Sequence, residues 1–282
     1  MNTDNQLLTL LKENKFKFNK GLGQNFIFDK NLLKAIVHDA SITSADTVVE
    51  IGTGAGTLTL ELAAVAKKIY TFEVDKNLSS ILEKTFEPYN NIELHFTDIL
   101  RIKQQDFKNI VNVPFKIVAN LPYYITTPIL THLIENTKRI DGYVVMMQRE
   151  VANRLNAKVG TKDYNSLTIL LNYYTNVEYL FTVPKKVFVP APNVESAVVK
   201  IMTKEERDFE ADSNFFKFVR SCFVQRRKTL LNNLISSYGK DKKQNFQDSC
   251  LDCDIDSKRR SETLTLMEFY NLYTNLKNND LI

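Results

Sequence analysis

Runs of β-branched and aromatic residues alternate with amphipathic stretches along the chain from about Thr47 onwards. Five runs have the length and composition of β-strands: Thr47–Ile51, Ile69–Val74, Ile92–Phe96, Phe115–Ala119 and Tyr143–Met147. Helical spacing is predicted over 57–67 and 77–86 and again from Arg149 and from Ser166. Pro128 fits the first turn of the helix that precedes the fifth strand, because that position needs no N–H. Strands that alternate with helices predict a parallel sheet flanked by helices.

The pattern changes after residue 203. Two late strands, Val177–Val183 and Ser196–Met202, are joined by a proline-rich link over 184–194, as is typical of an antiparallel pair. The charged segment Lys204–Asp212 lacks apolar periodicity, so a domain boundary is predicted there. Helical spacing then returns over 215–223, 230–235 and 266–276. The sequence thus predicts an α/β domain over 1–203 and a helical domain over 204–282.

Composition places the chain among ordinary globular proteins. Of its 282 residues, 44% are hydrophobic and 25% are charged, which argues against disorder, collagen and coiled coil. Three cysteines in a chain of this length exclude a disulfide scaffold, and Cys250-x-x-Cys253 has no second pair, so no metal site is predicted. No apolar run approaches the ~18 residues of a membrane helix. We expect a cytoplasmic protein that does not enter a membrane.

Positive charge is concentrated in one segment, although the net charge is only +4. Between Ser213 and Lys243 there are eight basic residues and one acidic residue, Asp241. A smaller excess lies near the N-terminus, at Lys12, Lys15, Lys17 and Lys20. Clustered positive charge attracts a phosphate backbone, although a solvated helix face would give the same pattern.

Residues at the ends of three successive predicted strands point to a cofactor. Gly52–Gly56 (GTGAG) links a strand to a helix, a turn that fits NAD, FAD and S-adenosylmethionine folds alike. Glu73 lies 21 positions after Gly52, where an acid is placed to accept hydrogen bonds from both ribose hydroxyls. Asp98 follows the third strand and is placed to accept a hydrogen bond from an adenine amino group. Together they predict an adenosine-containing cofactor.

The fourth strand ends in Asn120-Leu121-Pro122-Tyr123, which resembles the catalytic motif of methyltransferases that act on exocyclic amino groups of nucleobases. Such an amine is a poor nucleophile because its lone pair is delocalised into the ring. The Asn120 side-chain oxygen and the carbonyl of Leu121 or of Pro122 can each accept one of its N–H bonds and so localise the lone pair. Tyr123 offers a flat face on which the base can stack.

The chain as a whole resembles the ribosomal RNA adenine dimethyltransferase family, and within it the small-subunit branch. The matching segments are 23–26 (GQNF), 52–56, 120–125 (NLPYYI), 147–152 (MQREVA), 187–192 (VFVPAP), 196–199 (SAVV), 225–230 (QRRKTL) and 261–264 (SETL). There are two departures. Ile27 stands where leucine is usual, which matters little if the backbone makes the contact, and Ala191 replaces a proline.

The resemblance implies a seven-stranded Rossmann-like methyltransferase sheet with a small all-helical C-terminal domain. It also implies that S-adenosylmethionine donates two methyl groups to each of two adjacent adenosines in a hairpin near the 3′ end of small-subunit rRNA. The expected substrate is the immature small ribosomal subunit, and the expected state is a monomer.

Site residues follow from the motif positions. The implied cofactor-binding residues are Asn25, Ile27, Gly52, Gly54, Glu73, Asp98 and Asn120. The implied catalytic residues are Asn120, Leu121, Pro122 and Tyr123, with Phe188 as a second aromatic wall for the base, although Phe188 also fits an ordinary core position. The basic cluster supplies the predicted RNA-binding residues Arg220, Arg226, Arg227 and Lys228.

Three alternative functions are retained at this stage. The sister branch methylates large-subunit rRNA and confers macrolide resistance, but Leu121 and the segments 196–199 and 225–228 favour the small-subunit branch. A mainly non-catalytic ribosome-assembly factor would not need an intact Asn120–Tyr123 motif. A nicotinamide-dependent oxidoreductase leaves both that motif and the basic cluster unexplained.

Overall fold

A computed structural model describes residues 3–136, 140–207, 209–212 and 214–282. The chain divides into two compact units. The first contains residues 1–152 and 177–203, and the second contains residues 153–176 and 204–282. The segment 153–176, which the sequence analysis assigned to the first domain, therefore groups with the C-terminal helices, whereas the change at 203/204 coincides with the predicted boundary.

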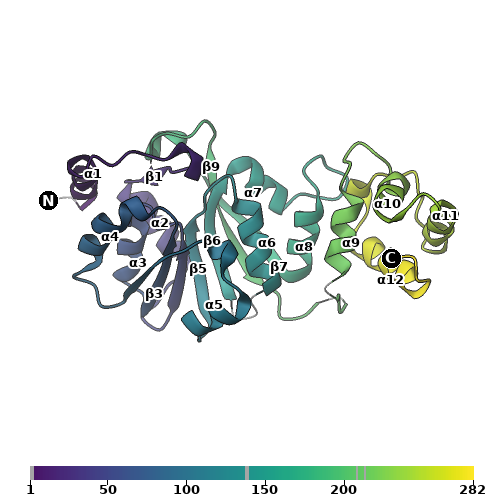
Figure 1. The fold of residues 1–282 in the computed structure, drawn as a ribbon, viewed down its shortest axis with the longest axis horizontal. Helices are drawn as coiled ribbons and strands as arrows, with labels where there is room; N and C mark the ends of the chain where they lie inside the picture. Colours follow the sequence, from purple (N-terminus) through teal and green to yellow (C-terminus); the bar gives the residue numbers. More distant parts are fainter. Residues whose placement is uncertain (1–2, 137–139, 208, 213) are drawn as a thin grey trace. The chain divides into compact units, whose positions relative to one another are not determined.

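Seven strands of the described residues form one mixed sheet in the order β4-β3-β2-β5-β6-β9-β7 (Figure 1). They are β2 (Thr47–Ile51), β3 (Lys68–Glu73), β4 (Ile92–Phe96), β5 (Phe115–Asn120), β6 (Ile140–Gln148), β7 (Thr175–Val183) and β9 (Ser196–Thr203). The pairs β2–β3, β3–β4, β2–β5 and β5–β6 are parallel, and β9 runs antiparallel to β6. The predicted seven-stranded sheet is confirmed.

The strand order reverses at β2, because the chain continues to β3 on one side of it and later returns to β5 on the other. Parallel strands end at one edge of the sheet, so the residues that follow β2 to β5 meet at the carboxyl edge. In open α/β sheets this point of reversal is where ligands bind.

Helices of the first unit include several that the sequence analysis did not predict. The α-helices in the described part of this unit are α1 (Thr3–Glu13), α2 (Lys30–Asp39), α3 (Thr57–Ala63), α4 (Ser79–Phe86), α5 (Gln104–Ile110) and α6 (Thr126–Asn136), and α7 (Arg149–Leu155) begins in this unit and ends in the second. The helices α1, α2 and α5 were not predicted. The helix α3 ends before Lys67, because the Lys67 N–H bonds to the Asp46 carbonyl at 2.9 Å and directs the chain into β3.

The N-terminal segment forms a second, two-stranded sheet. The strand β1 (Phe26–Ile27) pairs antiparallel with β8 (Phe188–Val189), which lies inside the predicted proline-rich link. The ring of Phe26 packs against those of Phe16 and Phe18, with centroids 5.9 and 5.3 Å apart. This aromatic cluster belongs to a core that includes residues of α4, so it fixes the N-terminal segment to the first unit.

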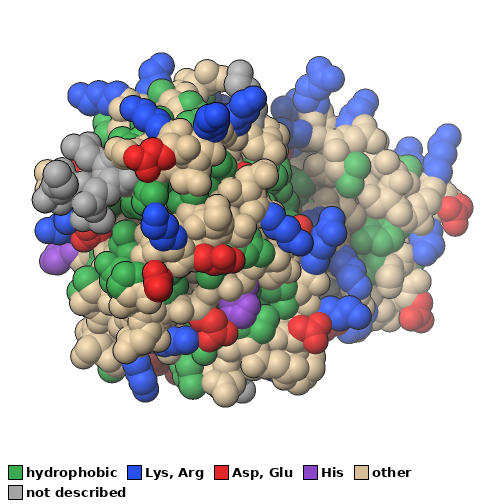
Figure 2. Space-filling view, turned by 60° about the vertical axis from the view of Figure 1, so that its left-hand side comes forward, with side chains coloured by type: hydrophobic (Ala, Val, Ile, Leu, Met, Phe, Trp, Pro, Cys, Tyr) green, Lys and Arg blue, Asp and Glu red, His purple; other side chains and the backbone are tan. Residues whose placement is uncertain are grey.

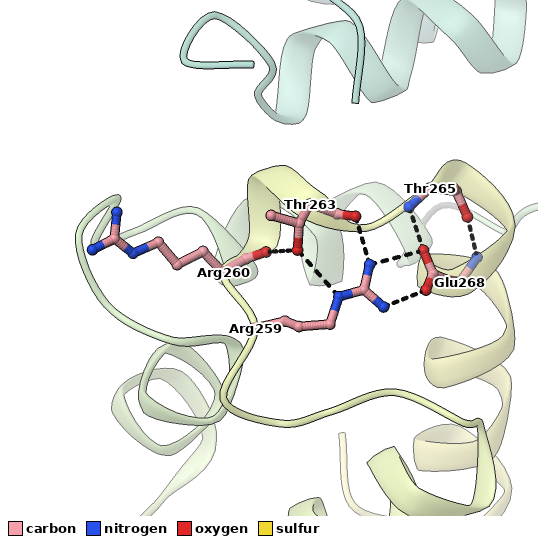
Figure 3. Close-up of polar contacts among 5 residues, drawn as sticks. All are labelled: Arg259, Arg260, Thr263, Thr265 and Glu268. Atoms are coloured by element: carbon pink, nitrogen blue, oxygen red, sulfur yellow. Dashed lines mark hydrogen bonds and ion pairs between the residues drawn. The ribbon is translucent and has the colours of Figure 1, made fainter. Parts of the chain in front are cut away.

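The second unit is built from helices around an aromatic core. They are α8 (Ser166–Tyr174), α9 (Phe215–Cys222), α10 (Leu230–Tyr238), α11 (Lys243–Asp252) and α12 (Leu266–Asn278). Arg259 lies between α11 and α12 in the chain, and its guanidinium bonds to Glu268 at 2.5 Å and to Thr263 (Figure 3). Glu268 also closes the capping box of α12 with Thr265. Figure 3 shows that the Arg260 carbonyl accepts the Thr263 hydroxyl, whereas the Arg260 side chain points away from this network.

Every helix in the described residues is too short or too polar to cross a lipid bilayer.

Candidate active site

A cleft opens at the carboxyl edge of the sheet. Its lining comes from the N-terminal segment and from the residues at or after the ends of β2, β3, β4 and β5. The predicted site residues that line it are Asn25, Ile27, Gly52, Gly54, Glu73, Asp98, Asn120, Leu121, Pro122 and Tyr123. Segments far apart in the sequence thus meet in one place.

The glycine turn after β2 depends on a backbone that favours glycine. Gly52, Gly54 and Gly56 have φ values of 82°, 56° and 81°. A Cβ atom on Gly54 would lie 3.1 Å from the ring of Phe26, and one on Gly56 would lie 2.9 Å from the ring of Phe86. Aromatic rings therefore occupy the space that side chains at Gly54 and Gly56 would need, and both the φ values and the packing favour glycine.

Glu73, the last residue of β3, is held by the backbone around it. Its carboxylate accepts hydrogen bonds from the N–H groups of Gly54 (2.8 Å), Val74 (2.8 Å) and Asp75 (2.9 Å). Burial raises the pKa of this carboxyl group, and this effect is larger than the lowering of the pKa by the three hydrogen bonds. A carboxylate has about four acceptor sites, so three are used. Accepting both ribose hydroxyls, as predicted, would require one backbone bond to open.

Asp98 begins the 3-10 helix over Ile99–Arg101 that follows β4. One carboxylate oxygen accepts the Leu100 N–H at 3.0 Å, and the other lies 3.5 Å from the exposed Arg101 guanidinium. The carboxylate lines the cleft next to Thr97. The predicted contact between Asp98 and the adenine amino group stays a prediction.

Asn120, the last residue of β5, lines the cleft and carries a buried, unpaired acceptor. Its Nδ2 donates to the Asn25 carbonyl at 3.1 Å, whereas its Oδ1 is buried and has no hydrogen-bond partner in the described chain. A buried acceptor without a partner costs about 1–3 kcal/mol. Such an atom in a cleft marks a place where a ligand supplies the missing donor.

The turn after Asn120 is fixed by hydrogen bonds. The Leu121 N–H donates to the Met146 carbonyl at 2.9 Å. The Pro122 carbonyl accepts both the Ile125 N–H (3.2 Å) and the Thr126 hydroxyl (3.0 Å). Both lone pairs of Pro122 are therefore used. Of the two carbonyl groups that the sequence left open as acceptors for the amine, the geometry favours that of Leu121.

Glu50 is a cleft residue that the sequence analysis missed. It lies in β2 with 1% of its surface exposed, and one carboxyl oxygen accepts the hydroxyls of Thr59 (2.5 Å) and Thr71 (2.8 Å). Burial raises the pKa of Glu50 to about 8. An acid in an otherwise apolar strand, two positions before the glycine turn, was the signal that could have revealed it.

Phe188 does not line the cleft. It pairs with Ile27 across the two-stranded sheet and is 3% exposed in a hydrophobic cluster that includes Leu33 and Val198. The structure thus places it at a core position next to a cleft residue. Its predicted contact with the base stays a prediction.

The predicted RNA-binding residues lie on the second unit. Arg226, Arg227 and Lys228 are exposed in the loop between α9 and α10, and Arg220 is exposed in the last turn of α9. Asn233 of α10 holds this loop through the Gln225 backbone, accepting its N–H at 2.8 Å and donating to its carbonyl. The structure therefore brings the four cations to one junction of two helices.

Comparison with known proteins gives the family. The model of a family described as ribosomal RNA adenine dimethylase matches residues 15–274. This chain belongs to the ribosomal RNA adenine dimethylase family. Relatives named ribosomal RNA small subunit methyltransferase A include one from a Geobacillus species, 43% identical over 92% of both chains. Another, from Staphylococcus carnosus, is 45% identical over 98% of this chain and 95% of its own.

A solved structure supports the same family. The crystal structure of a dimethyladenosine transferase from Plasmodium falciparum has a TM-score of 0.72 and 29% identity, and the match covers 90% of this chain and 98% of that one. The predicted family, methyltransferase fold and enzyme class are confirmed.

S-adenosylmethionine is the methyl donor of this enzyme family, and the cleft fits it. Gly52 and Gly54 of the glycine turn line the cleft, and Glu73 and Asp98 add two carboxylates that can accept hydrogen bonds from hydroxyl and amino groups. The unpaired Oδ1 of Asn120 lies in the same cleft, where a second ligand, the base, would meet the donor.

Proposed function

We propose that this chain transfers two methyl groups to each of two adjacent adenosines near the 3′ end of small-subunit rRNA. The observation that carries the proposal is the buried, unpaired Oδ1 of Asn120 in a cleft with the Glu73 and Asp98 carboxylates. An acceptor in that place suits an amino group and not a carbonyl. The small-subunit names of relatives at 43% and 45% identity support the choice of rRNA.

The residues of the chain would bind and orient the base. The Asn120 Oδ1 and the Leu121 carbonyl accept the two N–H bonds of the adenine amine, so that its lone pair is directed out of the ring system. The ring of Tyr123, which lines the same cleft, stacks on the base; such stacking contributes about 1–3 kcal/mol. S-adenosylmethionine, when bound, supplies a methyl group already activated on a sulfonium. Orientation is therefore the main task of the protein.

The cofactor would be held by the N-terminal segment and the strand ends. We assign this role to the backbone of Asn25 and Ile27, to the turn that contains Gly52 and Gly54, and to the side chains of Glu73, Asp98 and Asn120. Glu50 joins them as a buried acid at the base of the same cleft.

Two surfaces would bind the RNA phosphates. The first is the set of four cations at the α9–α10 junction. The second lies on the first unit, where Figure 2 shows Lys and Arg side chains gathered on the side that carries α1 and β1. Lys12, Lys15 and Lys17 are exposed just before the cleft-lining segment, and Lys185 and Lys186 are exposed just before β8. Phosphate contacts position an RNA without reading its sequence.

We propose that the substrate is the immature small ribosomal subunit in the cytoplasm and that the enzyme acts as a monomer. The decisive experiment offers methyl-labelled cofactor with purified small subunits, large subunits and deproteinised rRNA from cells that lack this activity, followed by mapping of the labelled nucleotides. We expect label at two adjacent adenosines of the small subunit only. Label on the large subunit would favour the sister branch. No transfer to either subunit, with binding retained, would favour an assembly factor.

Removing charge at the α9–α10 junction is expected to weaken RNA binding uniformly across sequences. The double variant Arg226→Ala/Arg227→Ala should bind small-subunit RNA about 10-fold more weakly near physiological salt, and the slope of log K against log[salt] should fall by about 1–2. The measurement is a filter-binding titration over several salt concentrations. Lys84→Ala/Lys108→Ala removes the same charge from exposed positions on the first unit and serves as control. Equal slopes for the two variants would contradict the assignment.

A further inference from the structure

The hydroxyl of Tyr123 is held inside the protein. It forms a hydrogen bond with the hydroxyl of Ser196, the first residue of β9, which is fully buried. The Tyr123 ring is partly buried at the cleft, so its oxygen points into the sheet and not towards solvent. Neither the family motif at 120–123 nor the segment 196–199, taken alone, predicts this contact.

Ser196 occupies a fixed position. It pairs with Gln148, the last residue of β6, in the antiparallel ladder. The neighbouring Glu195 is fastened to Arg149 twice, through its carbonyl, which accepts the Arg149 N–H at 3.0 Å, and through an ion pair between the side chains. The Ser196 hydroxyl is therefore attached to backbone that two independent contacts hold in place.

The Tyr123 ring is fastened at both ends. Its Cα end belongs to the turn that Leu121 and Pro122 fix through the Met146, Ile125 and Thr126 contacts described above. Its far end is the phenol oxygen bound to Ser196. A phenyl ring without such a bond can swing about χ1, whereas two fixed ends define the direction of the axis that runs from Cβ through the ring to the phenol oxygen. The place at which a base can stack, and with it in-line methyl transfer, depends on that direction.

The geometry points to Ser196 as a positioning residue: its hydroxyl holds the phenol of Tyr123 and so sets the position and long axis of the ring on which the target adenine stacks. The inference rests on the proposed function, since it needs a base on that ring. It also assigns the phenol a structural task and no proton transfer. Burial raises the pKa of Tyr123, so the phenol stays neutral at physiological pH.

A double-mutant cycle tests the tether. The variants are Ser196→Ala, Tyr123→Phe and the pair together, and both kcat and KM are measured for methyl transfer to small-subunit particles. We expect each single substitution to lower kcat about 10-fold with the KM for S-adenosylmethionine unchanged, and the double variant to be no slower than either single one. Ser196→Thr, which keeps the hydroxyl, should recover most of the loss.

The control is Thr203→Val, which removes a side-chain hydrogen bond from the other end of the same strand, where Thr203 donates to the Ile140 carbonyl at 3.0 Å. We expect its kcat to equal that of the wild type. Multiplicative losses in the double variant, or equal losses in Thr203→Val, would overturn the inference. A pH-rate profile that loses a limb in Tyr123→Phe would also overturn it, because the phenol would then take part in proton transfer.

A second cycle keeps the tether testable without activity. The thermal midpoints of the same four proteins, measured by circular dichroism, should show losses in Ser196→Ala and Tyr123→Phe that do not add in the double variant. Additive losses would show that the two hydroxyls are not coupled and would overturn the inference. If the wild type transferred no methyl group to either subunit, the proposed function would fail, while the unfolding cycle would still decide whether the tether exists.

Discussion

Replacing Asn120 by alanine is expected to lower kcat for methyl transfer by about 10²–10³-fold, with at most a small loss of RNA affinity. The reason is that the Asn120 Oδ1 is the unpaired buried acceptor of the cleft, and removal of one preorganised hydrogen-bond partner of a reacting group has an effect of this size. Single-turnover methylation of small-subunit particles gives the rate of methyl transfer, and a parallel binding titration gives the affinity for RNA.

The matched control for this variant is Asn91→Ala. Asn91 also has a partly buried amide, but it donates to the Ala63 and Ala66 carbonyls, and it does not line the cleft. Its loss should lower stability and leave kcat close to that of the wild type below the unfolding temperature. If Asn120→Ala lost RNA affinity and turnover by the same factor, the side chain would act in binding and not on the amine.

The free energy of unfolding of the cofactor-free protein should fall by about 2 kcal/mol from pH 6 to pH 8 because of Glu50 alone. Its pKa is raised by burial to about 8 in the folded protein, from an ordinary value of 4.5. Between those values the folded state binds more protons than the unfolded state, so stability is lost as pH rises through this window. In Glu50→Gln, a neutral side chain of the same shape replaces the acid, and this contribution should disappear.

Urea unfolding at several pH values from 6 to 9 measures how steeply the free energy of unfolding falls with pH in the wild type and in Glu50→Gln. Glu73 is buried nearby, and its pKa is also raised. Because Glu73 is present in both proteins, its effect cancels when the pH dependence of the free energy of unfolding in Glu50→Gln is subtracted from that of the wild type. Glu87→Gln, at an exposed position, is the control and should keep the slope of the wild type. Equal slopes in the wild type and Glu50→Gln would mean that Glu50 is already ionised at neutral pH.

Local pattern was sufficient for the elements of the sheet. The bounds of Thr47–Ile51 and Ile92–Phe96 are those of β2 and β4, because short apolar runs bounded by polar residues leave few alternatives. Local pattern did not predict the elements that form only by pairing with a distant segment of the chain. Phe26–Ile27 and Phe188–Val189 are strands because they pair with one another across the chain. The apolar helix α8 was placed in the first domain, whereas in the structure it groups with the C-terminal helices, since its periodicity does not say what it packs against.

In the candidate site, too, residues in local motifs were predicted, whereas residues that depend on distant partners were not. The motif residues Gly52, Glu73, Asp98 and Asn120 lie in one cleft, as the ends of parallel strands require. Glu50 was missed because its burial depends on hydrogen bonds from hydroxyls of α3 and β3. The sequence next to Glu50 does not show that these hydroxyls lie beside it. The Tyr123–Ser196 bond was missed for the same reason, because 73 positions separate its partners.

The hydrogen bond from Asn120 to the Asn25 carbonyl has a consequence for which purines can react. With its nitrogen committed to Asn25, the Asn120 amide cannot rotate by 180° without breaking that bond, so it shows an oxygen to whatever enters. Guanine and hypoxanthine carry an oxo group at ring position 6, and that oxygen would face an oxygen, with no proton between the two. Sites built around a defined hydrogen bond reject a mismatched partner strongly, because the buried group is left unpaired. If Asn120 binds the target base as proposed, a single amide held in one orientation would discriminate 6-amino purines from 6-oxo purines before any methyl group moves.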